Sequence, residues 1–324
     1  MTFLINLILS IVIPPVMLTI GNLSDAWTRR AVGFFSWLFR ILNYPGMKVI
    51  HANLKIAYPE MDEKKRRQMA RNIVRHLIWN CLDFIRIQKH PEIAQKMLTE
   101  MDFGGIDISK QLIVALSHLG NWELLANATA NHFHRPAVIA NDFSAFPKLQ
   151  EMLVGSREAT GLRIIYKSGA APKCLKALEM GDTVAILLDQ NLAPRKGGIF
   201  VNFYGLPVPI TPLPAILAIR SKVPVITATT IRKEDGTFKL IVRGVPMPEG
   251  ELNNENVTQA IMKANEELIR QYPEQYNWFY KRWNFLPPDT EENMKAALAH
   301  FPYYAQKKYT PKRIRQNCNE PKQE

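Results

Sequence analysis

The sequence predicts an α/β protein built on a mostly parallel mixed sheet that is flanked by helices, with a hydrophobic helix at its N-terminus. From residue 111 onward, short and almost wholly apolar runs alternate with helical stretches. Residues 1–24 carry no charged side chain, and 47% of the 324 residues are hydrophobic, which is enough for a sizeable core. Strands that alternate with helices are typical of parallel sheets joined by right-handed crossovers.

Residues 3–20 are almost wholly apolar, a length at the lower limit for crossing a bilayer. No basic residue opens this segment and no small-residue cleavage site closes it, so we expect a retained membrane anchor over residues 1–24 rather than a secretory signal. Pro14 and Pro15 lack the N–H donor that a helix needs, which predicts either a kinked span or a shallow hairpin. A buried core helix is the competing interpretation.

Residues 25–110 are predicted to form a helical layer that faces the membrane. Aromatic residues at 34–39 lie among Arg29, Arg30 and Arg40, a mixture that suits the headgroup region of a bilayer. The basic flank predicts that the body of the protein lies on the cytoplasmic side. A helix is expected to begin at Asp62, with one apolar face formed by residues four apart.

Residues 111–285 are predicted to form the α/β core. The expected strands cover residues 111–116, 137–140, 162–166, 183–188 and 224–230, with an antiparallel strand at 238–243 after a turn at Asp235-Gly236. The expected helices cover residues 122–132, 148–160, 172–180, 212–221 and 254–272. Residues 286–324 form a basic tail, for which we expect either a solvated chain or a segment drawn to the membrane.

The charge balance indicates acidic partners. Lysine and arginine total 41 against 29 acidic residues, which gives a net charge of +12. No helix-turn-helix, RNA-binding signature or zinc finger is present, so nucleic acid is not the expected partner. Cys81, Cys174 and Cys318 are too far apart for a disulfide framework or a zinc site. Without a P-loop, a dinucleotide fingerprint or a metal-ligand cluster, no cofactor and no metal are expected.

Two strand ends carry residues suited to chemistry. His118 follows the first strand, Gly120 permits a tight corner, and Glu123 comes five residues after the histidine. Ligand sites in open α/β sheets lie at this edge, where Glu123 can hold one imidazole nitrogen and leave the other as a base. Asp189 and Gln190 follow another strand and are expected to face the same crevice, although a turn is the simpler role for them.

Together these motifs resemble the late acyltransferases of lipid A biosynthesis, within the lysophospholipid acyltransferase-like superfamily. The resemblance covers about residues 25–285. It rests on SHLGNWE at 117–123, LLDQN at 187–191, the segment from Gly197 to Thr211, and WFYKRW at 278–283. The absence of a Pro-Glu-Gly-Thr segment favours this branch over the glycerol-phosphate branch. Pro214 stands where the family often has glycine, and the tail beyond about residue 286 matches nothing in the family.

The resemblance implies a catalytic dyad in which His118 is the general base and Glu123 orients it and stabilises its charge. Arg157 corresponds to an arginine of this branch, with Arg163 as the competing assignment, and Asp189 corresponds to the acid of the Asp-Gln pair. Arg157 and Asp189 are expected to pair with each other or to orient the acceptor. The backbone N–H groups of Gly120 and Asn121 are the expected oxyanion donors.

The implied reaction moves a fatty acyl chain from acyl carrier protein, a substrate rather than a cofactor, to a hydroxyl of a lipid A precursor. The expected partners are therefore the acyl carrier protein, an anionic glycolipid and the inner membrane, with the catalytic domain on the cytoplasmic side. Alternatives are the same chemistry on another glycolipid, aminolipid or lysophospholipid, a hydrolase that uses water, and a membrane-bound carrier-protein or lipid binder with an inactive dyad.

Overall fold

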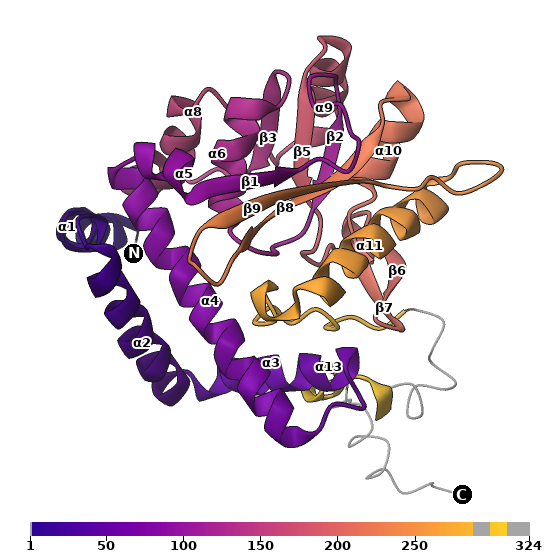
Figure 1. The fold of residues 1–324 in the computed structure, drawn as a ribbon. Helices are drawn as coiled ribbons and strands as arrows, with labels where there is room; N and C mark the ends of the chain where they lie inside the picture. Colours follow the sequence, from indigo (N-terminus) through magenta and orange to yellow (C-terminus); the bar gives the residue numbers. More distant parts are fainter. Residues whose placement is uncertain (1, 288–298, 310–324) are drawn as a thin grey trace, which may run out of the picture.

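The computed structural model describes residues 2–287 and 299–309, with only the backbone described at residues 2–9 and 307–309. Its main feature is a seven-stranded sheet in the order β1-β9-β8-β2-β5-β3-β4, beside a separate two-stranded ribbon, β6-β7 (Figure 1). The strands are β1 (Leu98–Asp102), β2 (Ile113–Leu116), β3 (Pro136–Ala140), β4 (Arg163–Tyr166), β5 (Thr183–Leu187), β6 (Ile199–Phe203), β7 (Leu206–Ile210), β8 (Val225–Arg232) and β9 (Phe238–Gly244).

Helices precede the sheet and cover it. Before β1 lie α1 (Thr2–Gly21), α2 (Asp25–Leu42), α3 (Tyr44–Ala57), α4 (Glu63–Lys89) and α5 (Glu92–Met97). Within the sheet region lie α6 (Trp122–His132), α7 (Pro147–Gln150), α8 (Ser156–Ala159), α9 (Ala170–Glu179), α10 (Leu213–Ser221) and α11 (Asn254–Gln271), followed by α13 (Tyr303–Tyr309). A π-helical turn, η1 (Glu151–Gly155), joins α7 to α8, and 3-10 turns occur at η2 (Pro194–Lys196) and η3 (Pro273–Gln275).

The predicted α/β class is confirmed. Strands β2, β3, β4, β5 and β8 run parallel, and β9 pairs antiparallel with β8 as expected. Strand β1 differs from the expectation, because it lies in the segment predicted to be helical and pairs in parallel with β9 at the edge of the sheet. Three of its five residues are exposed, so it lacks the apolar run that marks a buried strand.

The N-terminal segment forms one helix, α1, which continues through Pro14 and Pro15, so the predicted hairpin does not form. Helix α1 packs against α4. We expected a membrane-anchoring helix here; among the residues that the structure describes, no helix has both the length and the apolarity required to cross a membrane.

Each strand of the sheet centre buries both of its faces. Ile113 and Ala115 of β2 point into the larger hydrophobic cluster, which includes α9, α10 and α11. Val114 and Leu116 point into the second cluster, beneath α6. This two-sided burial explains why the strands are continuous apolar runs without alternation.

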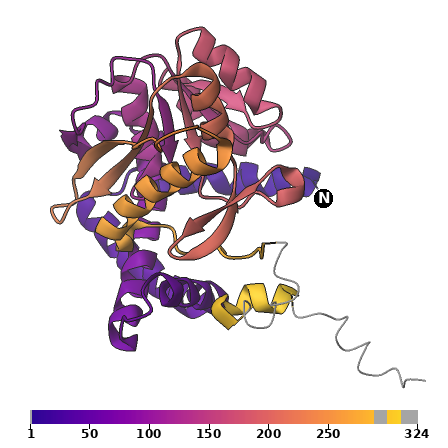
Figure 2. The same ribbon diagram turned by 90° about the vertical axis from the view of Figure 1, so that its right-hand side faces the viewer.

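Contacts between helix α3 and the C-terminal part of the chain complete the packing around the larger hydrophobic cluster. The Asn53 side chain of α3 donates to the carbonyl groups of Trp278 and Tyr280, both at 2.8 Å. The Tyr304 hydroxyl of α13 donates to Asn53 Oδ1 at 2.5 Å, and α13 lies beside α3 (Figures 1 and 2). Part of the expected basic tail is therefore folded, whereas Cys318 and the basic residues beyond 309 lie outside the described residues.

The loop after β2 is held from several sides at the carboxyl end of the sheet. Asn80 of α4 donates to the Gly120 carbonyl at 2.7 Å, and Thr229 of β8 donates to the Leu119 carbonyl at 2.8 Å. Gly120 has a φ of +66°, and a Cβ there would overlap the Thr230 carbonyl. The corner therefore requires glycine for two reasons, a left-handed backbone and a close approach.

We expect Gly120→Ala to lower the free energy of unfolding by about 1–2 kcal/mol for the left-handed backbone and by a further 1–3 kcal/mol for the overlap. Gly169 is a matched control, because its φ is +64° and nothing lies within 4 Å of a Cβ built there. Gly169→Ala should show only the first loss. Denaturant unfolding of both variants measures the difference, and equal losses would show that the approach to Thr230 carries no cost.

Candidate active site

Strand register brings His118 and Asp189 together. Leu116 of β2 pairs in parallel with Leu187 of β5, so the residues two positions further along each strand also lie side by side. His118 and Asp189 occupy these positions, at the carboxyl end of the sheet where ligand sites of open α/β folds lie. The expectation that the two strand ends face the same crevice agrees with this arrangement.

Asp189 holds His118 through two hydrogen bonds. Its Oδ1 lies 2.7 Å from Nδ1 of the imidazole, and its Oδ2 accepts from the His118 backbone N–H at 2.9 Å. An ionised carboxylate only accepts hydrogen bonds, so Nδ1 carries the proton and Nε2 keeps a free lone pair. The His118 ring also meets Trp122 edge-on, with the ring centroids 5.1 Å apart.

Burial and charge act in opposite directions on this pair. Burial lowers the pKa of His118, but the charge and hydrogen bond of Asp189, with the more distant Glu123, outweigh it and leave the pKa above its ordinary value. Burial raises the pKa of Asp189, yet its interactions with His118 and Arg282 outweigh burial and hold that pKa below its ordinary value. Asp189 is therefore ionised at neutral pH.

The bond expected between Glu123 and His118 does not form in this structure, and neither does a pairing of Arg157 with Asp189, which is one of the two alternatives for those residues. Glu123 does not bond to His118; it accepts from Arg157, with Nη2 to Oε1 at 2.6 Å and Nε to Oε2 at 3.2 Å. Asp189 bonds to His118 and not to Arg157. Glu123 lies in the first turn of α6 and points toward α8, whereas Asp189 is adjacent to His118 across β2 and β5.

Of the competing arginines, the structure brings Arg157 to the site. Arg163 forms an ion pair with Asp182, which directly precedes β5 and so lies at the amino end of the parallel strands, away from His118. Gln190 is exposed, next to Asp189.

The two N–H groups expected to bind an oxyanion are already occupied. Gly120 N–H donates to the Gln275 carbonyl at 3.0 Å, and Asn121 N–H donates to the Thr230 carbonyl at 3.0 Å. This corrects the assignment of both residues as oxyanion donors. The Asn121 side chain instead caps α6 by accepting from the Leu124 N–H.

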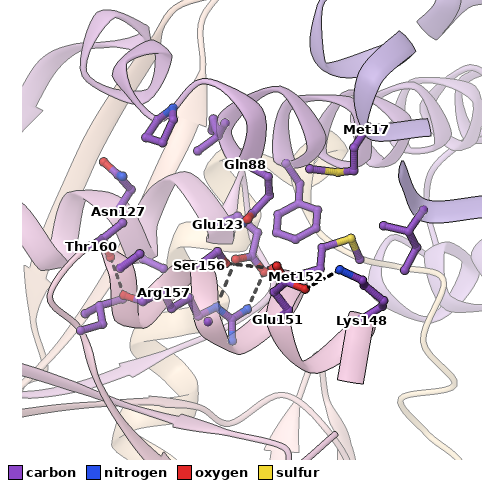
Figure 3. A pocket seen from close by; sticks show the side chains of 18 of the residues that line it. Met17, Gln88, Glu123, Asn127, Lys148, Glu151, Met152, Ser156, Arg157 and Thr160 are labelled. Atoms are coloured by element: carbon purple, nitrogen blue, oxygen red, sulfur yellow. Dashed lines mark hydrogen bonds and ion pairs between the residues drawn. The ribbon is translucent and has the colours of Figure 1, made fainter. Parts of the chain in front are cut away.

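A cavity of about 510 Å³ opens beside Glu123 and Arg157 (Figure 3). Helices α1, α4, α6 and α8 form its walls, with Met17 and Met152 labelled in Figure 3 on opposite sides. A second and smaller apolar cavity of about 50 Å³ lies between α6 and the sheet, and Arg157 lines both. Within residues 2–287 and 299–309, no group of three or more His, Cys, Asp or Glu side chains is placed to hold a metal ion.

Comparison with protein families decides the assignment. The family described as bacterial lipid A biosynthesis acyltransferase matches residues 3–284, most of the chain. This chain belongs to that family. It is therefore an acyltransferase of lipid A biosynthesis. A comparison with curated proteins gives no significant match.

In this acyltransferase, the sequence alone did not reveal what supports Asp189. The 278–283 segment holds the loop that follows it: Asn191 N–H donates to the Tyr280 hydroxyl at 3.1 Å, and Asn191 Nδ2 donates to the Lys281 carbonyl at 3.1 Å. Tyr276 is buried against Asp189, and its pKa is raised well above the ordinary value by burial and by that carboxylate. In the sequence, the aromatic and basic residues at 278–283 are the only indication of this role, and core packing explains that pattern equally well.

Exchanging the two carboxylates for amides should distinguish their roles in the acyltransferase. We expect Asp189→Asn to lower the pKa of His118 clearly, because it removes both a charge and a charged hydrogen bond. Glu123→Gln should lower it less, because Glu123 acts only through its charge and is neutralised by Arg157. NMR titration of the histidine resonances measures both values. A larger effect from Glu123→Gln would show that Glu123 is the true partner.

Proposed function

We propose that the protein transfers a fatty acyl chain from acyl carrier protein to a hydroxyl of a lipid A precursor, with His118 as the general base. The observation that carries the proposal is the bond from His118 Nδ1 to Asp189 at 2.7 Å, which leaves Nε2 free to accept a proton. Family membership supports acyl transfer in lipid A biosynthesis. The donor, the acceptor and the roles of individual residues are the proposal.

In the proposed reaction, the acceptor hydroxyl attacks the thioester carbonyl while His118 Nε2 removes its proton. The tetrahedral intermediate then collapses, the ester forms, and the carrier-protein thiol leaves with the proton from His118. Asp189 orients the imidazole and stabilises its positive charge. Glu123, paired with Arg157, adds negative potential without bonding to the ring. General base assistance of this kind is typically worth about 10²–10⁴ in rate.

The start of α6 offers oxyanion donors in place of Gly120 and Asn121. Within the described residues, the N–H groups of Trp122 and Glu123 donate to no acceptor, as is usual for the first turn of a helix. Trp122 also touches the His118 ring. We therefore place the oxyanion against these N–H groups, where the helix dipole also favours negative charge.

Ser117, which stands beside His118, is not part of the proposed chemistry. Its hydroxyl donates to Asn265 Oδ1 of α11 at 2.9 Å, and Asn265 in turn donates to the Ala115 carbonyl at 3.0 Å. The serine therefore ties the end of β2 to α11. The proposed acyl transfer is direct, without a covalent serine intermediate.

The larger cavity is suited to a lipid chain. Most of its lining is apolar, and its polar side is formed by groups such as Glu123, Arg157 and Lys148 (Figure 3). Ile13, Pro14 and Met17 of α1 form one wall. The net charge of +12 would attract an acidic carrier protein and a phosphorylated acceptor.

Helix α2 supports the proposed location at the cytoplasmic face of the inner membrane. Its buried side packs on α4, while its opposite side exposes Trp27, Phe34 and Trp37 by about half of their surface each (58%, 55% and 49%). The Arg30 guanidinium lies 4.7 Å from the centre of the Trp27 ring. Aromatic and basic side chains together on one helix face favour the interface of an anionic bilayer.

Acyl transfer from acyl carrier protein to a lipid A precursor tests the chemistry. We expect His118→Ala to lower the rate about 10²–10⁴-fold, because the general base is lost. His132→Ala, a change at an exposed histidine, is the control and should retain full activity. If the wild-type enzyme acylates other lipids but not the lipid A precursor, the proposed identity of the acceptor is wrong. Acyl release without an acceptor would indicate a hydrolase, and activity retained in His118→Ala would disprove the mechanism.

Binding to anionic phospholipid vesicles tests the surface of α2. We expect the triple variant Trp27→Ser, Phe34→Ser and Trp37→Ser to bind at least about tenfold more weakly, because three interfacial side chains are lost. The control is the double variant Met247→Ser and Leu252→Ser, which removes exposed apolar side chains from the loop after β9. Equal binding by the triple variant and the wild type would show that α2 is not the membrane contact.

A further inference from the structure

Arg282 is a buried cation that the proposed reaction does not use. Only 2% of it is exposed, and it lies in the 278–283 segment behind the Asp189 loop. Its Nη1 donates to Asn191 Oδ1 at 3.0 Å, and its Nε is buried without a hydrogen-bond partner among the described residues. A buried charge is costly unless another charge or dipole compensates it, so this side chain calls for an explanation.

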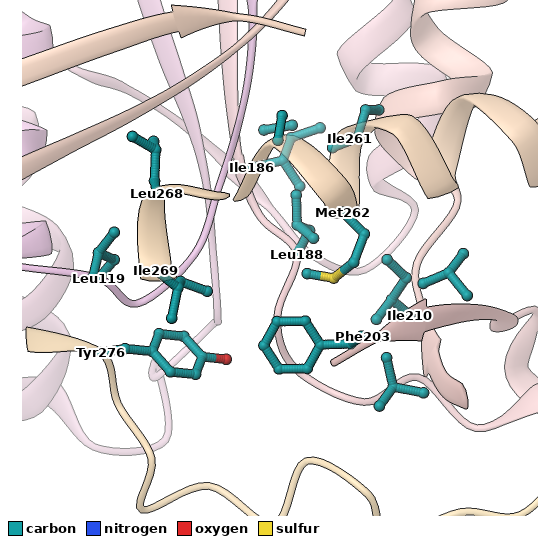
Figure 4. Close-up of a cluster of buried hydrophobic side chains, with 14 of the residues drawn as sticks. Leu119, Ile186, Leu188, Phe203, Ile210, Ile261, Met262, Leu268, Ile269 and Tyr276 are labelled. Carbon is teal, nitrogen blue, oxygen red and sulfur yellow. The ribbon is translucent and has the colours of Figure 1, made fainter. Parts of the chain in front are cut away.

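The surroundings of Arg282 are mostly apolar. Its Nη2 lies 3.6 Å from Met262 Sδ, and its guanidinium carbon lies 5.4 Å from the centre of the Phe203 ring. Figure 4 shows Phe203, Met262 and Tyr276 gathered near Leu188, the residue that precedes Asp189. A thioether and an aromatic ring compensate a full positive charge only weakly, so the principal compensation must come from a carboxylate.

Asp189 is a buried carboxylate on which the Arg282 charge acts, without a direct hydrogen bond between the two side chains. It is itself 4% exposed, and Arg282 is one of the two charged groups that lower its pKa, the other being His118. Asn191 lies two residues after Asp189, so the bond from Arg282 to Asn191 also fixes the loop that carries the acid. Arg282 therefore acts on Asp189 in two ways: its charge stabilises the ionised carboxylate, and its hydrogen bond to Asn191 holds the loop in which Asp189 lies.

We propose that Arg282 is a positioning residue that holds Asp189 ionised and in place, and thereby sets the proton affinity of His118. This inference rests on the proposed function, because it assigns His118 the role of general base. It connects three motifs that are distant in the sequence: Asn191 after β5, Phe203 on β6, and the 278–283 segment.

Other charged groups near the pair do not take this role. Glu123 of α6 and Arg157 of α8 form a bidentate ion pair and largely cancel each other. The Tyr276 hydroxyl stays protonated, because burial and Asp189 raise its pKa well above the ordinary value. Tyr304 of α13, on which the Arg282 charge also acts, has a pKa raised by burial and is likewise neutral.

The expected effect on the pH profile has a defined sign. A general base must be unprotonated, so the rate rises with pH as the His118–Asp189 pair loses its proton. Without the Arg282 charge, the Asp189 carboxylate is uncompensated while His118 is neutral, so the pair binds a proton more tightly. The acidic limb of the pH–rate profile should then move to higher pH, by about one pH unit.

Two substitutions separate the charge of Arg282 from its hydrogen bond. Arg282→Gln keeps a donor for Asn191 but removes the charge, and it should move the acidic limb upward. Arg282→Lys keeps the charge, so the acidic limb of its pH–rate profile should lie at the same pH as that of the wild type, even if kcat falls. Lys281→Met is the matched control, because it removes a positive charge from the exposed neighbouring residue, and its limb should not move. A lower kcat with an unmoved limb in Arg282→Gln would overturn the proposal.

A second measurement covers failures of folding or of the assay. If Arg282→Gln unfolds, the double variant Arg282→Gln with Asp189→Asn should recover thermal stability, because neither buried charge is then left alone. No recovery would overturn the proposal. NMR titration of His118 in Arg282→Gln measures the upward shift of the His118 pKa without any substrate. An inactive wild type would therefore disprove the proposed function, whereas an unchanged His118 pKa in Arg282→Gln would overturn this inference.

Discussion

The site depends on the buried carboxylate of Asp189, which must remain ionised in a place that disfavours charge. It does so because His118 donates to it from both ring and backbone, and because Arg282 supplies a compensating charge behind it. These contacts fix the tautomer and the orientation of the imidazole. The tight corner at Gly120 and the loop at Asn191 then have one common purpose, which is to hold the two strand ends in register.

The second ion pair, between Glu123 and Arg157, gives the acyltransferase motif a different meaning from the one that its spacing suggests. A histidine and an acid five residues apart invite the conclusion that they bond to each other. Here the acid bonds to an arginine that lines both the large and the small cavity. The pair therefore forms part of the boundary between these two cavities, while its negative member still acts on the imidazole through space.

Much of this fold could be predicted from the sequence, because buried parallel strands are continuous apolar runs and α6 begins and ends where its pattern predicts. Strand β1 could not be predicted, since an exposed edge strand lacks that signal. The pairing of His118 with Asp189 depends on β5 lying next to β2, although β3 and β4 intervene in the sequence. Strand order of this kind is a tertiary property, so the sequence could indicate candidate residues but not that His118 bonds to Asp189.

The bonds from Asn53 to the carbonyl groups of Trp278 and Tyr280 join positions 225 and 227 residues apart. The early helices therefore cannot complete their packing until nearly the whole chain has left the ribosome. Until then, the surface of α3 that contacts the 278–283 segment has no partner, and exposed apolar surface favours aggregation or adsorption to a bilayer. The order of synthesis thus gives the nascent protein an interval in which its first helices are free to meet lipid before the C-terminal segment encloses them.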